Sequence, residues 1–186
     1  MTEQVRYVVA VHLGTLFTSG PAEVEPDDVE RSLSGIIADI EDADGLLVID
    51  GSFSDAISSR MNRAIAEKLR EARQAGELAA RVWGCDNEEP HYSGWEAAAM
   101  DGGFGTRHRN QEIAARAAWP FLCGATEIVI TGAWATRDLS SGCVSSVLSV
   151  LRELMPAHIR VVQSESCLFE EYMDDPGQGD DPELFP

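Results

Sequence analysis

The stretch EIVITGAWATRDLSSGCVSSVLSVL, residues 127–151, decides the fold. Its first five residues are mostly apolar and β-branched, which is typical of a buried strand in a parallel sheet. A loop of small and polar residues follows. From Cys143 onward, apolar residues recur at helical spacing, namely Val144, Val147, Leu148 and Leu151. A strand, a loop and an amphipathic helix in succession form the repeating unit of α/β proteins.

The same alternation runs through most of the chain. Strand-like apolar runs occupy residues 6–11, 46–50, 78–83, 127–131 and 159–162. Helical spacing begins near residues 26, 54, 106 and 143. This strict alternation predicts an α/β fold, specifically a three-layer α-β-α sandwich with a mostly parallel, doubly wound and Rossmann-like sheet. Within the expected helix 106–122, we expect Pro120 to distort or end the last turn. Residues 87–105 lack either period and are predicted to form a functional or mobile loop.

The chain length of 186 residues suits one domain. We expect residues 1–169 to form this single α/β domain. Residues 170–186, EEYMDDPGQGDDPELFP, lack apolar periodicity and are acidic. They are therefore predicted to be a mobile tail that promotes solubility.

The charge balance excludes some classes of partner. Asp and Glu total 32 against 14 Lys and Arg, which gives a net charge of −18. Such a surface repels phosphate backbones and anionic lipids, so neither nucleic acid nor a membrane surface is an expected partner. Lys68 is the only lysine. Two explanations stay open: adaptation to a salt-rich (halophilic) cytoplasm, which we favour, and a genome rich in arginine codons.

The cysteine pattern predicts the cellular compartment, and the absence of certain motifs argues against the common cofactors. The four cysteines form no CxxC pair and no regular framework, as expected in a reducing compartment such as the cytoplasm. No leader or apolar run of about 20 residues is evident. GxGxxG after the first strand, a Walker loop and GxSxG are all absent, so no cofactor is predicted. A zinc site from Cys85, His91, His108 and Cys143 matches no known spacing, so no metal is predicted.

Candidate functional residues follow the strands. Ligands of doubly wound sheets bind beyond the carboxyl ends of the strands, where His12, Asp50 and Cys143 are expected. Cys143 falls in the first turn of a helix, a position that lowers the pKa of a thiol and stabilises developing negative charge. Asp50 is placed to accept the thiol proton. The alternative is that Cys143 packs inward beside Val144 while Asp50 caps the next helix, and the residues alone leave both open.

Several short patterns between about residues 46 and 167 carry a resemblance. They are LLVID at 46–50 followed by Phe53, AR-x-x-G at 72–76, and Thr131-Gly132, Thr136 and Cys143-Val144. Together they resemble the isochorismatase-like cysteine hydrolase family, whose signature is T-G-x-x-T-x-x-C-V. The resemblance implies that Cys143 is the nucleophile and Asp50 the proton acceptor. It also implies that the backbone before Cys143 is the oxyanion site.

The sequence departs from that family at the catalytic lysine. Lys68 lies in another segment, and Arg107 or Arg109 occupies the lysine's register. Arginine stabilises a thiolate or an anionic substrate but does not shuttle a proton. We expect Arg109 to act in catalysis, and Arg107 to bind substrate together with His12, Trp134 and Thr136. The loop between Gly132 and Cys143 is longer than usual, and residues 1–44 lie outside the family core.

These observations predict a cysteine hydrolase that cleaves a small amide or ester through a thioester intermediate. Its partner is expected to be a small molecule, and the protein is expected to be a homo-oligomer. One alternative is a catalytically lapsed relative that serves as a binding or oligomerisation module. Another is an unrelated Rossmann-like ligand-binding protein with His12 and Asp50 in its crevice.

Overall fold

The computed structural model describes residues 4–13, 26–49, 58–76, 82–86, 105–107 and 111–169. Within these residues, six strands form one sheet in the order β4-β3-β2-β1-β5-β6, and every neighbouring pair is parallel. The strands are β1 (Arg6–Val11), β2 (Gly45–Ile49), β3 (Val82–Asp86), β4 (Gly105–Arg107), β5 (Glu127–Gly132) and β6 (Arg160–Gln163). The predicted α/β fold with a parallel sheet is thereby confirmed.

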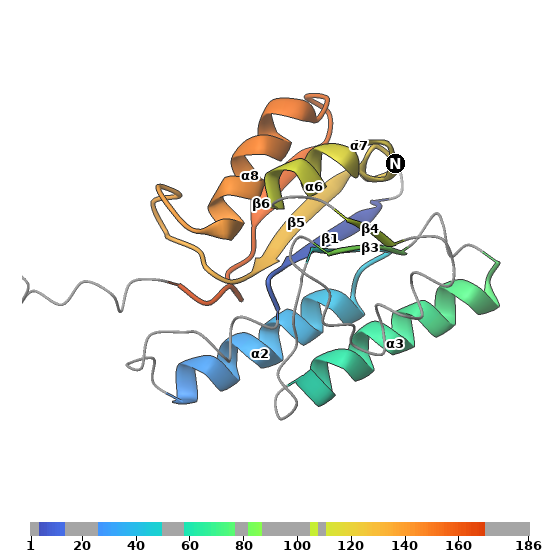
Figure 1. The fold of residues 1–186 in the computed structure, drawn as a ribbon, viewed down its shortest axis with the longest axis horizontal. Helices are drawn as coiled ribbons and strands as arrows, with labels where there is room; N and C mark the ends of the chain where they lie inside the picture. Colours follow the sequence, from blue (N-terminus) through green and yellow to red (C-terminus); the bar gives the residue numbers. More distant parts are fainter. Residues whose placement is uncertain are drawn as a thin grey trace, which may run out of the picture.

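Helices cover both faces of the sheet (Figure 1). They are α2 (Pro26–Glu41), α3 (Ser58–Gln74), α6 (Gln111–Ala117), α7 (Trp119–Leu122) and α8 (Cys143–Leu154). Figure 1 shows α2 and α3 on one face and α6, α7 and α8 on the other. No helix within the described ranges is long and apolar enough to cross a membrane.

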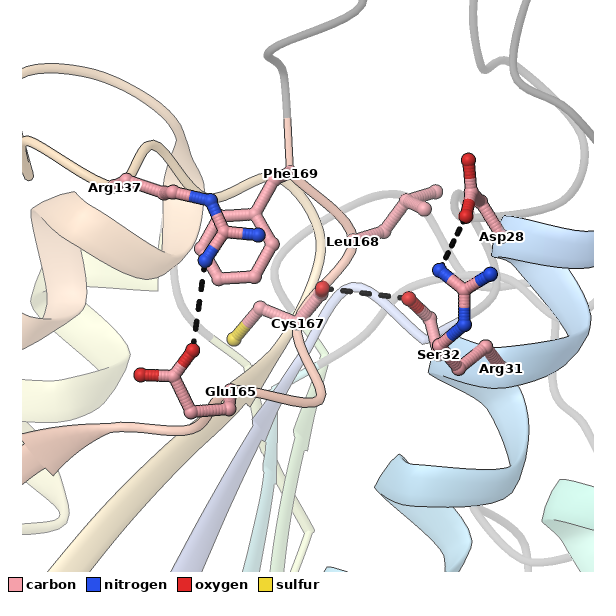
Figure 2. Close-up of a pocket in the computed structure, with 8 residues that line it drawn as sticks. All are labelled: Asp28, Arg31, Ser32, Arg137, Glu165, Cys167, Leu168 and Phe169. Carbon is pink, nitrogen blue, oxygen red and sulfur yellow. Dashed lines mark hydrogen bonds and ion pairs between the residues drawn. The ribbon is translucent and has the colours of Figure 1, made fainter.

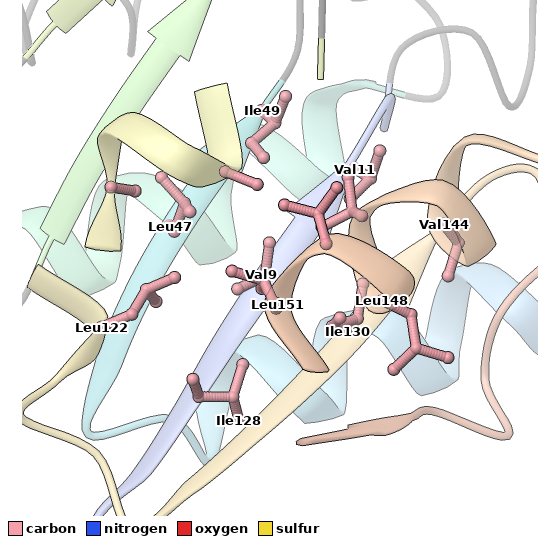
Figure 3. Close-up of a cluster of buried hydrophobic side chains, with 14 of the residues drawn as sticks. Val9, Val11, Leu47, Ile49, Leu122, Ile128, Ile130, Val144, Leu148 and Leu151 are labelled. Atoms are coloured by element: carbon pink, nitrogen blue, oxygen red, sulfur yellow. The ribbon is translucent and has the colours of Figure 1, made fainter. Parts of the chain in front are cut away.

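The central strand β1 supplies side chains to two separate hydrophobic clusters. Val9 and Val11 join the cluster beneath α6 and α8 (Figure 3), whereas Val8 and Ala10 join the cluster beneath α2 and α3. This division follows from the two-residue period of a strand, which sends successive side chains to opposite faces. An uninterrupted apolar run such as that of β1 is therefore needed to bury both faces.

The register of the sheet positions the strand ends. Val11, at the end of β1, pairs with Ile49 of β2 and with Gly132 of β5. Because β1, β2, β3 and β5 are parallel, their carboxyl ends lie along one edge of the sheet, as the sequence predicted. We refer to this edge as the carboxyl edge and to the opposite one as the amino edge.

Two predicted elements need correction. The strand expected at 78–83 extends in the structure from Val82 to Asp86, and residues 77–81 lie outside the described ranges. The helix expected from Thr106 is wrong at its start, because Gly105–Arg107 forms β4 and the helix begins at Gln111. Three residues are too few to display a period. Their conformation is set by hydrogen bonding to the edge of β3, which a sequence pattern does not show.

Pro120 has the effect expected of it. The helical segment is divided at Ala118 into α6 and α7, with the proline in the first turn of α7. Proline has no N–H to donate, and this absence is harmless only in the first turn of a helix. The predicted domain, 1–169, and the predicted tail stay predictions, because residues 170–186 lie outside the described part of the chain.

Candidate functional site

The turn after β5 brings the following loop against the end of β1. Gly132 has φ 121°, and a Cβ atom at this position would lie 2.0 Å from the carbonyl oxygen of Val11. Only glycine fits so close a backbone approach. The next residue, Ala133, donates its N–H to that same oxygen at 3.0 Å. The chain therefore leaves β5 directly beside the end of β1.

The loop then closes back on its own beginning. Cys143 is the first residue of α8, and the N–H of the next residue, Val144, donates to the carbonyl oxygen of Trp134 at 3.1 Å. This bond fixes the start of α8 at the carboxyl edge. Cys143 is half-buried and packs against the hydrophobic cluster under α8. It therefore combines both sequence-based expectations: it begins a helix and its side chain contacts the core.

Hydrogen bonds within the loop between β5 and α8 hold its conformation. The hydroxyl of Thr136 donates to the carbonyl oxygen of Ser141 at 3.3 Å and accepts the N–H of Ser141 at 3.2 Å. The carboxylate of Asp138 accepts the hydroxyl of Ser140 at 2.7 Å and its N–H at 3.0 Å. These bonds, chiefly the one from the Ser140 hydroxyl, hold the pKa of Asp138 below its usual value. Trp134 is half-buried and packs against the cluster on the α2 side.

His12 lies between the end of β2 and the loop after β5. Its N–H donates to the carbonyl oxygen of Ile49 at 2.8 Å, and Ile49 is the last residue of β2. His12 has φ 49°, in the left-handed region that residues other than glycine seldom adopt. Asp50 follows Ile49 in the chain but lies outside the described residues. His12 thus marks the centre of the carboxyl edge.

The strand that carries Arg107 is distant from the strand that leads to Cys143. Arg107 ends β4, which is four strands from β5 in the sheet. At about 4.8 Å per strand this separates the backbones by roughly 19 Å, more than the length of an arginine side chain. Arg109 lies outside the described residues. The roles predicted for both arginines stay predictions.

The single lysine lies at the amino edge of the sheet. The ammonium group of Lys68 donates to the carbonyl oxygen of Ala43 at 3.0 Å, and Ala43 precedes β2. The charge therefore lies beyond the end of α2, where the helix dipole favours a cation. Because Cys143 lies at the carboxyl edge, Lys68 does not replace the catalytic lysine of the family that the sequence resembles.

Two other cysteines, Cys167 and Cys123, have different surroundings. Cys167 is buried, and its thiol donates to the carbonyl oxygen of Ile130 at 3.6 Å. Burial raises the pKa of this thiol from 9.0 to about 12. Cys123 is half-buried at the end of α7. No group of three or more metal-ligating side chains occurs in the part of the chain that the structure describes.

The sequence did not indicate a pocket of about 130 Å³ beside α2 (Figure 2). It is lined by Asp28, Arg31, Ser32, Arg137, Glu165, Cys167, Leu168 and Phe169. These residues come from three distant segments, and none belongs to a recognisable motif. Their proximity follows from the order of β1, β5 and β6 in the sheet, which spacing along the chain does not reveal.

Comparison with protein-family models, curated proteins and solved structures gave no match to this chain. The resemblance described above therefore rests on the patterns quoted for it. The position of Cys143 and the pocket beside α2 must be interpreted from their own geometry.

Proposed function

We propose that the chain is an isochorismatase-like cysteine hydrolase that cleaves a small amide or ester. The observation that carries this proposal is the neighbouring order β2-β1-β5 at the carboxyl edge. Backbone bonds link Ile49 to His12, Val11 to Ala133, and Trp134 to Val144. They form a continuous path from the residue before Asp50 to the residue after Cys143. Two strand spacings, about 10 Å, separate β2 from β5, a distance that two side chains and a small substrate can span.

We also propose a three-layer α-β-α sandwich with doubly wound, Rossmann-like connections. Two observations support this architecture: the hydrophobic clusters on opposite faces of the sheet, and the strand order, which extends outward from β1 in both directions. In such sheets the ligand site lies where the strand order reverses. Here that point lies between β1 and β5, beside His12 and Trp134.

The proposed reaction has two stages. Asp50 accepts the thiol proton of Cys143, the sulfur bonds to the substrate carbonyl carbon, and backbone N–H groups near the start of α8 stabilise the oxyanion. The leaving amine or alcohol departs with the proton from Asp50, which leaves a thioester. Water then gives a proton to Asp50 and attacks the thioester. The acid is released, and the proton returns to the sulfur. His12, Trp134 and Thr136 bind the substrate, and Arg109 stabilises negative charge.

Alkylation of the native protein by iodoacetamide at pH 7, measured for each cysteine by mass spectrometry, tests the nucleophile. Cys143 is expected to react fastest, because a thiolate at a helix start is the reactive species. Cys167 provides an internal control, because it is buried and protonated. Asp50→Asn is expected to slow the reaction of Cys143 severalfold. Asp42→Asn, at an exposed position near the amino edge, should leave it unchanged.

Equal alkylation rates for Cys143 and Cys123 would contradict the proposed nucleophile. The chain would then be better described by the second candidate, a catalytically lapsed relative acting as a binding or oligomerisation module. Lys68 and Arg107 favour this candidate, because one lies at the amino edge and the other four strands from β5.

We further propose a salt-rich cytoplasm as the working environment, a small molecule as the partner and a homo-oligomer as the functional form. The net charge of −18 supports the first of these, because concentrated salt screens repulsion between like charges. The same charge argues against nucleic acid or an anionic membrane as a partner.

A further inference from the structure

The pocket beside α2 has a charged wall on each side (Figure 2). Asp28, Arg31 and Ser32, from the first two turns of α2, form one wall. Arg137, from the loop between β5 and α8, and Glu165, from the turn after β6, form the other. The segment 167–169 lies between them. The pocket therefore joins three segments at the carboxyl edge, and Cys143 is not among its lining residues.

Each wall carries an ion pair. Arg31 bonds to Asp28 on α2, and the guanidinium of Arg137 lies 3.5 Å from the carboxylate of Glu165. The two arginine side chains are 74% and 59% exposed. Asp28 is 16% exposed and Glu165 is 92% exposed. Water competes at least for the arginine of each pair, which weakens both pairs. A ligand that offers charged atoms of its own can therefore replace part of each pair at little cost.

The segment between the walls is held firmly by hydrogen bonds. Ser32 donates its hydroxyl to the carbonyl oxygen of Cys167 at 3.3 Å. Leu168 donates its N–H to the carbonyl oxygen of Gly132 and accepts the N–H of Ala135, each at 3.1 Å. The guanidinium carbon of Arg137 lies 4.3 Å from the centre of the Phe169 ring, a contact that orients the guanidinium. The pocket is thus formed before any ligand arrives.

The charges of the pocket select for a ligand with both signs. Among the described lining residues, the charges of two arginines and two carboxylates balance, whereas the whole chain carries −18. The chain as a whole repels a simple anion, and a simple cation would leave both arginines of the pocket without a new negative partner. A zwitterion has no net charge, so it avoids both penalties.

We propose that this pocket binds a small zwitterion of the α-amino-acid type. Its carboxylate faces Arg31 at the start of α2, and its ammonium group faces Glu165. A cavity of about 130 Å³ suits a molecule of the size of valine. This binding site does not depend on the proposed hydrolase activity, because it does not use Cys143.

Titration of the full-length, ¹⁵N-labelled protein with L-valine, followed by NMR, tests the charge selectivity. Saturable shifts are expected for the backbone resonances of residues 165–169. L-valinamide, which keeps only the ammonium group, and isovalerate, which keeps only the carboxylate, should each bind at least about fivefold more weakly. A valine titration without saturation would overturn the proposal. So would isovalerate or valinamide binding as tightly as valine.

Matched variants test the location of the site. Arg31→Gln and Glu165→Gln should each weaken valine binding at least about fivefold. Arg116→Gln and Glu153→Gln serve as controls, because they break an exposed 3.5 Å ion pair between α6 and α8, outside the pocket. Equal weakening by the control pair would overturn the assignment. Cys143→Ser should bind valine normally, so a failure of the hydrolase proposal leaves this result unaffected.

Discussion

Burial separates the chemistry of Cys167 from that of Cys143. Cys167 is 2% exposed, and loss of hydration is the main cause of its raised pKa. The negative charge of Asp39 adds to the increase, while a hydrogen bond from the backbone of Gly132 opposes it. The thiol is therefore neutral near pH 7 and is not a nucleophile there. Cys143 is half-buried at the start of α8, so its thiol is less shielded from water than that of Cys167.

The raised pKa of Cys167 predicts a loss of stability at alkaline pH. The folded state holds the thiol proton up to about pH 12, whereas an unfolded thiol releases it near pH 9.0. The stabilisation is thus complete below pH 9 and is lost as the pH rises toward 12. In this window the free energy of unfolding should fall by up to about 1.4 kcal/mol per pH unit from this group. Urea unfolding between pH 8 and pH 10.5 measures this slope.

Cys167→Ala is the control for that measurement. The substitution lowers stability at every pH because it leaves a small cavity, but it removes the titrating group. Its free energy of unfolding should therefore decline less steeply above pH 9 than that of the unchanged protein. Identical slopes for the two proteins would contradict the assigned burial of Cys167.

The residues of the candidate site were predictable to the extent that each follows a strand. His12 and Trp134 were expected at the carboxyl edge because apolar runs identify β1 and β5, and the structure locates both there. The resemblance puts Arg107 or Arg109 in the register of the family's lysine, and that role stays a prediction. The sequence does not give the strand order, in which β4 is the edge strand farthest from β5 and β6. Spacing along the chain predicts at which edge of the sheet a residue lies. It does not predict which strands lie beside it.

At the level of elements, the turn between β5 and its loop depends on Gly132. Alanine there would bring a Cβ atom to 2.0 Å from the carbonyl oxygen of Val11, at a φ of 121°. We expect Gly132→Ala to lower the free energy of unfolding by at least about 3 kcal/mol, because backbone strain and a clash act together. Urea unfolding monitored by circular dichroism measures the loss.

Gly76 offers a matched control for that prediction. It follows the end of α3 with φ 71°, and a Cβ atom there would contact nothing within 4 Å. Gly76→Ala therefore introduces strain alone, which is expected to cost about 1–2 kcal/mol. If both substitutions cost the same, the close approach of β5 to β1 is not as the structure describes.

The elements differ in how well their patterns predicted them. β1 was predicted with the observed bounds, because its short apolar and β-branched run favours a strand that is buried on both faces. α8 likewise begins at the residue where helical spacing starts. β4 was missed because its three residues owe their conformation to β3 rather than to their own sequence. A strand whose own apolar side chains are buried can be predicted from its sequence. A short strand that forms only by pairing with a neighbouring strand cannot.

At the scale of the whole molecule, the few cations are used at structurally important places. Arg6 bonds to Asp39 at 2.7 Å, and Arg160 bonds to Glu127 at 2.8 Å, on both sides of β5. Lys68 lies beyond the end of α2. The chain has 14 cations against 32 acids. Within the described ranges, most of the acidic side chains are exposed. Repulsion among them opposes the compact state.

This imbalance predicts that stability increases with salt. Between 0.1 M and 1 M KCl the screening length shrinks from about 10 Å to about 3 Å, which relieves long-range repulsion more than it weakens close ion pairs. The melting temperature should therefore rise over this range.

Glu41→Lys separates the effect of charge from other effects of salt, because Glu41 is exposed in the last turn of α2, where a negative charge is unfavourable. The variant should be more stable than the unchanged protein in 0.1 M KCl, by about 0.3–1 kcal/mol, and nearly equal to it in 1 M KCl. A melting temperature that stays constant, or a variant whose advantage is equally large at both salt concentrations, would show that charge repulsion does not limit the stability of this protein.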